Sequence, residues 1–183
     1  MQRRKFITIL GGAAFAWSFL AASMLAVQAS EIRFPKTGKY AFHLTLLKGW
    51  HSRMDIRGGL LLVPPSSNQH AMIYIVILVD DKYRGQPDSV IAGAVGKIAG
   101  IQTFDKQEPA QVSDSNGTTF HKGTAFYGKI PANLGLARMA KLMIFRLEPN
   151  TWAELWIVAQ PGLNAAEVDS LEQVLNGITL TSE

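Results

Sequence analysis

Side chains that commonly hold metals or act as nucleophiles are few in this sequence and lie far apart. None of the four histidines shows the HxxxH or HExxH spacing of a metal site. Cysteine is absent, which excludes disulfides, thiolate metal sites, a cysteine nucleophile and a lipid-modified cysteine. We therefore expect neither a metal nor a cofactor. The histidines are His43, His51, His70 and His121.

Acidic residues form two patterns that could support chemistry. Asp80 and Asp81 are adjacent, but consecutive residues of an extended chain point in opposite directions, which favours a solvated strand end over a cation site. Glu154 lies between Trp152 and Trp156, a spacing that could make a sugar platform. Aromatic residues of a half-buried strand belong more often to the core, and we favour that interpretation.

Catalytic motifs are missing from the sequence. No serine lies in a G-x-S-x-G turn, and no glycine-rich phosphate loop follows a strand and opens a helix. Carboxylate pairs for hydrolysis are assembled in space, so a hydrolase or carbohydrate-acting enzyme remains the alternative to a non-catalytic protein. Such an enzyme needs a concave pocket that brings carboxylates or a histidine together.

The loop at 129–138 has a composition suited to binding. Ile130, Leu134 and Leu136 lie there between Lys129 and Arg138, whereas loops are normally polar. This pattern favours contact with a protein partner or a small apolar ligand. The alternative is a loop that folds back over the sheet.

A helix is predicted to open at Pro87 and to carry a second candidate surface. One side gathers small residues, Gly93 and Gly96 among them, although solvated helix faces are usually charged. Glycine in a helix costs about 1 kcal/mol relative to alanine, so something should pack closely there. That is either another segment of the chain, or a partner or ligand. The expected core side is Val90, Ile91, Ala94, Val95 and Ile98.

The N-terminal segment has the features of an export signal. Arg3, Arg4 and Lys5 precede an apolar run at 6–27, and small residues precede Ser30, which predicts cleavage after Ala29. The paired arginines and the weakly hydrophobic run resemble a twin-arginine signal. An uncleaved membrane anchor is the alternative, because the run is long enough to span a bilayer. We expect a periplasmic protein that contacts a membrane only if this leader stays attached.

The mature chain is expected to form a single domain at 40–183 after a polar linker at 30–39. The run at 72–79 is apolar without alternation, which predicts an inner strand covered on both faces. A helix follows Asn164, with Glu167 completing a capping box and Gly177 at its end. Other strands are predicted at 40–47, 54–57, 59–63, 102–112, 118–127, 142–147, 152–159 and 178–180.

These elements predict an α+β fold: an antiparallel sheet of about six to eight strands covered by helices. In the hairpin around 148–151, regular pairing places two apolar sets on opposite faces. The first set is Met143, Phe145, Leu147, Trp152 and Trp156, and the second is Leu142, Ile144, Leu155 and Ile157.

The charge of the chain does not indicate nucleic-acid binding. The formal net charge is +4, from 18 basic and 14 acidic residues. Three of the basic residues lie in the leader, so 15 basic residues face 14 acidic ones in the remainder, a net charge of +1. No clustered basic stripe is present there, which argues against a nucleic-acid partner.

The order of elements, with Lys48-Gly49-Trp50 near the start, resembles the PsbP-like superfamily, including the DcrB-like bacterial envelope proteins. The resemblance spans 40–180 and implies an antiparallel sheet between helices, in proteins that bind or assist assemblies without catalysis. It carries no set of functional residues. We therefore expect an exported, non-catalytic binding or assembly-accessory module whose partner is an envelope protein or a small apolar ligand.

Overall fold

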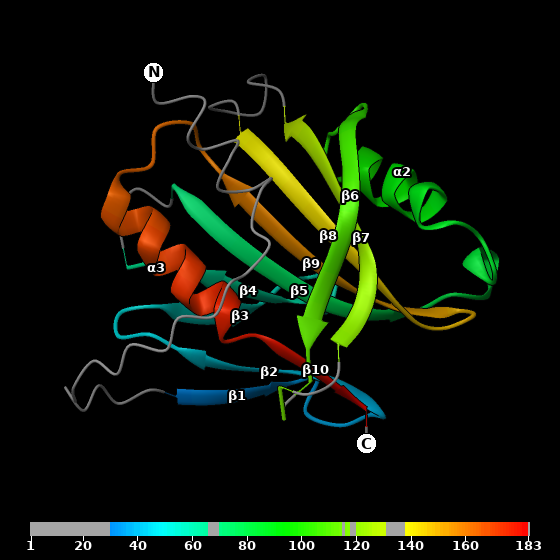
Figure 1. Cartoon of the computed structure of the whole chain (residues 1–183), viewed down its shortest axis with the longest axis horizontal. Coiled ribbons are helices and arrows are strands. Elements are labelled where there is room, and N and C mark those ends of the chain that lie inside the picture. Colours follow the sequence, from blue (N-terminus) through cyan, green and yellow to red (C-terminus); the bar gives the residue numbers. More distant parts are fainter. Residues whose placement is uncertain (1–29, 66–69, 115, 118–119, 131–137, 183) are drawn as a thin grey trace.

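Two antiparallel sheets and two α-helices make up the part of the chain that the structure describes (Figure 1). This computed structural model describes residues 30–65, 70–114, 116–117, 120–130 and 138–182. The larger sheet has the order β3-β4-β5-β9-β8-β7-β6, and the smaller one the order β1-β2-β10. The expected α+β fold with an antiparallel sheet is confirmed.

The large sheet is built mainly from hairpins that follow one another along the chain. Its strands are β3 (His51–Met54), β4 (Leu60–Val63), β5 (Ala71–Val79), β6 (Phe104–Ser113), β7 (Phe120–Ile130), β8 (Arg138–Glu148) and β9 (Thr151–Ala159). The apolar run predicted as an inner strand is β5, which lies between β4 and β9. Every residue of β9 is buried, so the two strands form the centre of the sheet.

The small sheet contains a strand where the sequence suggested a linker. Residues at 30–39 are polar, but β1 (Ser30–Phe34) pairs with β2 (Tyr40–Leu46) along its whole length. Phe34 is buried in the core, and its apolar ring explains why the segment pairs. The linker interpretation is therefore wrong for residues 30–34, which belong to the folded domain. β10 (Thr179–Ser182) pairs with the other edge of β2.

Separate apolar clusters cover the two faces of the large sheet. One face packs against β2, β10 and the helix α3 (Ala165–Asn176), and Phe42, Leu62 and Phe145 are fully buried there. The other face packs beneath the helix α2 (Asp88–Ile98), with Leu142 and Trp152 in its core. Figure 1 shows the two helices on different sides of the sheet.

The face prediction for the β8–β9 hairpin is wrong, and a bulge explains why. Glu148 pairs with Thr151, but Arg146 pairs with Trp152, so Leu147 is an extra residue on β8. A one-residue shift moves every side chain to the opposite face. Trp152 and Trp156 consequently share the α2 side with Leu142 and Ile144, while Met143, Phe145, Leu155 and Ile157 face α3.

Helix ends follow the sequence signals closely. Asn164 accepts a hydrogen bond from the Glu167 N–H at 2.9 Å, and Glu167 accepts one from the Asn164 N–H at 2.9 Å, so the predicted capping box is present. α2 begins after Pro87, with Asp88 in its first turn. A short 3₁₀ helix, η1 (Asp81–Tyr83), links β5 to this region.

Candidate binding groove

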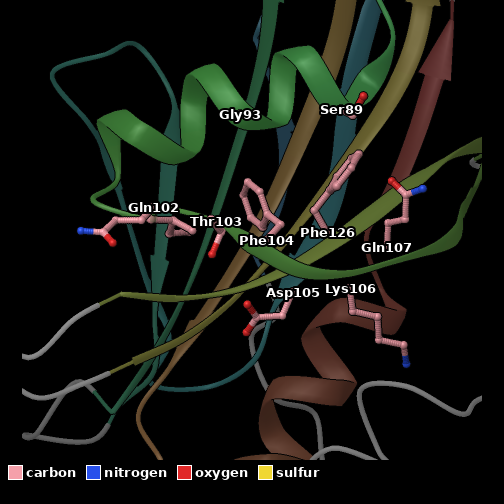
Figure 2. A pocket seen from close by; sticks show the side chains of 10 residues that line it. Ser89, Gly93, Gln102, Thr103, Phe104, Asp105, Lys106, Gln107 and Phe126 are labelled. Carbon is pink, nitrogen blue, oxygen red and sulfur yellow. The ribbon is translucent and has the colours of Figure 1, made fainter.

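A groove of about 440 Å³ runs between α2 and the start of β6 (Figure 2). Phe104 and Phe126 form its apolar floor, with their ring centroids 5.7 Å apart at an interplanar angle of 57°. Both rings point towards the helix in Figure 2. Its lining residues are Ser89, Gly93, Ile101, Gln102, Thr103, Phe104, Asp105, Lys106, Gln107 and Phe126.

The small-residue side of α2 forms the wall of this groove. Gly96 is buried against Phe104, and a Cβ added there would lie 2.7 Å from the ring atom Cε2. Gly93, one turn earlier, is exposed and would place a Cβ with no atom within 4 Å. Another segment of the chain therefore packs on Gly96, while Gly93 opens on the groove.

The buried side of α2 is rotated relative to the sequence prediction. Ile91 and Ala92 are buried, but Val90 is 45% exposed and Ile98 is 70% exposed. The small residues Ala92 and Gly96 allow the helix to approach the sheet on that side. This rotation is what brings Ser89 and Gly93 to the rim of the groove.

The outer rim of the groove is an edge strand with a bulge. β6 is the last strand of the large sheet, and Asp105 is the extra residue between the paired Phe104 and Lys106. The side chains of Asp105 and Lys106 point away from the helix in Figure 2. Both residues belong to the lining, and Lys106 forms an ion pair with Glu108, so the outer rim carries charged groups while the side facing α2 carries the two aromatic rings.

Arg146 fixes the start of α2 relative to the sheet. Its guanidinium donates to the carbonyl oxygen of Gln86 at 2.5 Å and to Asp88 Oδ1 at 3.3 Å. The other Asp88 oxygen, Oδ2, accepts a hydrogen bond from the Thr124 hydroxyl at 3.1 Å. Because β7 and β8 supply these partners, the helix side of the groove is held by side chains of the large sheet.

The apolar loop predicted as a binding surface is described only at its ends. Ile130 ends β7, pairs with Arg138 of β8, and is partly buried against the α2-side core. This residue therefore contributes to packing. Leu134 and Leu136 lie outside the described residues.

A second, smaller hollow of about 300 Å³ lies beside the start of α3. His70 Nδ1 is 3.0 Å from Glu167 Oε1, and Trp50 donates its indole N–H to the Ser170 hydroxyl at 2.9 Å. Hydrogen bonding from the Asn164 backbone, with a contribution from His70, holds the pKa of Glu167 below its usual range. The remaining lining is mostly apolar.

Glu154 is a buried acid that is fully engaged by its neighbours. Trp152 Nε1 donates to Oε1 at 2.8 Å and Trp156 Nε1 donates to Oε2 at 2.9 Å. Burial raises the pKa of Glu154, and the two indole donors offset part of that increase. The three side chains are buried, so the tryptophans are core residues and do not form an exposed sugar platform.

The other candidates from the sequence have structural roles. Asp80 accepts a hydrogen bond from the Lys82 N–H at 2.9 Å and caps η1. Asp81 accepts hydrogen bonds from Arg84 at 2.8 Å and from Asn150 at 2.9 Å. Within the described ranges, no group of three or more histidine or acidic side chains could hold a metal ion.

Sequence reasoning missed the residues that define the two hollows. Phe104 and Phe126 come from different strands, and no local pattern distinguishes them from core phenylalanines. His70, Glu167 and Ser170 meet only because α3 packs beside the start of β5. The small residues of α2 predicted close packing on that side of the helix, and the structure places Gly96 against Phe104 and Gly93 in the lining of the groove; partner binding at these residues stays a prediction.

Comparison with known proteins gives a match at the level of fold. No family model and no curated sequence matches the chain. LpqN of Mycobacterium tuberculosis, described as involved in cell envelope biogenesis, has a TM-score of 0.51 and 15% identity over 86% of this chain and 92% of its own. The chain therefore shares its fold with LpqN.

Two further solved structures have lower TM-scores. The PsbP of Synechocystis sp. PCC 6803 has a TM-score of 0.45 and 9% identity over 91% of this chain and 98% of its own. A structure from Bacteroides thetaiotaomicron has a TM-score of 0.45 and 16% identity over 78% of this chain. The chain spans only 45% of the length of that protein. At such identities the likeness concerns the fold alone.

Proposed function

We propose that this protein is a non-catalytic binding or assembly-accessory module of the cell envelope, and that the groove between α2 and β6 receives its partner. The observation that carries the proposal is the opening at Gly93. A helix glycine with free space above it lets a bound chain approach the backbone closely, next to the floor of Phe104 and Phe126.

The chemistry of the groove suits a partly apolar segment, with the charged residues Asp105 and Lys106 confined to the outer rim. Two aromatic rings supply the apolar contact, and Ser89, Thr103 and Gln107 supply hydrogen-bonding groups around it. Binding sites of this kind combine an apolar floor with a few polar groups that fix orientation. An apolar side chain of an envelope protein, or a small apolar ligand, fits this description.

The N-terminal segment supports an envelope location. Its basic start, apolar run and small residues before Ser30 are the features of an export signal, and we propose that the mature protein is periplasmic after cleavage behind Ala29. A retained anchor is the alternative. No helix within the described ranges is long and apolar enough to cross a membrane.

Filling the groove tests the proposal directly. Gly93→Phe places a ring in the open space at the wall, whereas Val90→Phe adds the same ring to an exposed position of the same helix outside the lining. Pull-down from envelope extracts should lose its specific partners with Gly93→Phe and keep them with Val90→Phe. Circular dichroism checks that both variants fold. Identical partner sets for both variants would contradict the proposal.

The loop at 129–138 is a second proposed contact for the same partner. Leu134→Asp and Leu136→Asp remove its apolar character and can be assayed in the same pull-down. Loss of partners would extend the binding surface from the groove to this loop, and unchanged partners would limit the surface to the groove.

A hydrolase is the second candidate function, and the hollow beside α3 is the observation that favours it. Ser170, His70 and Glu167 are residue types of a hydrolytic triad, and the His70–Glu167 contact is made. The Ser170 hydroxyl, however, accepts the hydrogen bond from Trp50. Labelling by a fluorophosphonate probe that is lost in Ser170→Ala would support the hydrolase. If the wild-type protein is not labelled, the hydrolase candidate is rejected.

A further inference from the structure

The hairpin that joins β3 to β4 ends in a well-formed turn, and we call residues 53–58 the hairpin tip. The Asp55 N–H donates to the Gly59 carbonyl at 2.8 Å, and the Gly58 N–H donates to the Asp55 carbonyl at 2.9 Å. Gly58 has a φ of +79°, a left-handed conformation that side chains other than glycine rarely adopt. The tip therefore has a fixed shape.

Two large apolar side chains are displayed on this tip. Ile56 is 101% exposed and Met54 is 60% exposed, so folding buries almost none of the isoleucine. Turn positions normally hold glycine, proline or small polar residues, each for a conformational reason that isoleucine does not share. A requirement outside the folded chain would explain an isoleucine at this position.

The apolar side chains lie between two arginines. Arg53 is exposed and forms no ion pair within the part of the chain that the structure describes. The Arg57 guanidinium lies 5.4 Å from the centre of the Tyr74 ring, and its Nε is 3.1 Å from Asp55 Oδ2. The charges of Asp55 and Arg57 offset each other, so residues 53–58 carry a net charge of +1, which comes from Arg53.

We propose that the hairpin tip inserts into the anionic surface of a lipid bilayer. An exposed apolar residue close to an exposed arginine suits the membrane interface, where the apolar side chain enters the acyl boundary and the Arg53 guanidinium meets a lipid phosphate. A stable protein interface buries about 800 Å² on each partner, far more than two side chains on a convex turn can offer. This lipid contact is independent of the groove and goes beyond the function proposed above.

The absence of cysteine makes a direct test possible. Ile56→Cys in the full-length chain, labelled with an environment-sensitive fluorophore, gives a probe at one defined position. Phe120→Cys is the matched control, because Phe120 is 45% exposed and lies on β7, separated from β3 by four strands of the sheet. The label at position 56 reports insertion of the tip itself, whatever the N-terminal segment does.

With vesicles containing phosphatidylglycerol, fluorescence at position 56 should rise severalfold and shift to the blue, while position 120 should not change. Neutral phosphatidylcholine vesicles should give little change at either position. Arg53→Gln should weaken the response at position 56 about fivefold in apparent affinity, because each arginine near an anionic surface contributes about that factor. No response at position 56, or an equal response at position 120, would overturn the proposal.

Discussion

Glu154 is the residue whose environment departs most from that of an ordinary surface acid. It lies on the central strand, 3% exposed, and both of its oxygens accept an indole hydrogen bond. The charge of Arg57 at the hairpin tip lowers the pKa of Glu154 slightly. The charge of Glu154 in turn helps to raise the pKa of Tyr74 on β5. The result is a buried acid with two neutral donors and no cation in contact.

Glu154→Gln should change how stability depends on pH. Burial raises the pKa of Glu154 above its usual value of 4.5, so its contribution to stability is complete below the unfolded pKa and is lost as pH rises through the folded pKa. As pH rises from below 4.5, the unfolding free energy of wild type should therefore fall relative to that of Glu154→Gln. Urea unfolding of both proteins at a series of pH values measures this difference in unfolding free energy.

The matched control for this experiment is Asp169→Asn, an exposed acid on α3. It makes the same acid-to-amide change on an exposed helix surface, so it reports the effect of that change outside the buried cluster of Glu154 and its tryptophans. A Glu154→Gln curve that runs parallel to wild type would contradict the prediction. Glu154→Ala, which leaves two buried indole N–H groups without an acceptor, should cost about 1–3 kcal/mol near neutral pH.

The helix α2 has two glycines one turn apart that differ in their surroundings. Gly93→Ala should stabilise the protein by about 1 kcal/mol, because alanine favours helix and its Cβ meets nothing within 4 Å. Gly96→Ala should destabilise it by about 1–3 kcal/mol, because its Cβ would press on the Phe104 ring, which is itself packed against Phe126.

Thermal or urea unfolding of the two α2 variants measures whether each substitution raises or lowers the stability of the protein. Each variant is the control for the other, since both make the same chemical change in the same helix. Equal effects would mean that α2 does not pack on β6 through Gly96. That result would also remove the geometric basis of the groove.

Local signals predicted the elements better than they predicted the faces of those elements. The capping box of Asn164 and Glu167 defined the start of α3 because both partners are three residues apart. The faces of β8 and β9 depend on the bulge at Leu147, which has no distinct residue type. The buried side of α2 depends on how closely small residues let the helix approach the sheet.

At the scale of the whole molecule, β1 joins the N-terminal end of the described chain to the small sheet. A chain beginning at Pro35 should be less stable than one beginning at Ser30 by at least about 2 kcal/mol, because it loses the burial of Phe34 and a five-residue strand. Urea unfolding of the two chains measures the difference. Equal midpoints would show that residues 30–34 behave as a linker after all.

The sequence supports the antiparallel sheet and its two-sided burial, because β5, β8 and β9 are apolar on both faces. The sequence does not predict which strands belong to the large sheet and which to the small one. That division depends on β2 pairing with β1 and β10, and β10 lies more than a hundred residues away along the chain. The groove follows from the same long-range packing, so the sequence pattern singled out Gly93 on a small-residue helix face without predicting a groove or the floor that Phe104 and Phe126 form.

Leu147 has a consequence for how the chain tolerates insertions and deletions. β8 holds one residue more than its pairing with β9 requires, and the bulge absorbs it at the end nearest the turn. Deleting Leu147 would leave Arg146 opposite Trp152 and every side chain on its present face. Deleting a residue in the regular part of β8 would instead move the side chains of one stretch of the strand to the opposite face of the sheet. Within β8, Leu147 is thus a position at which the length of the strand can change without exchanging the two cores.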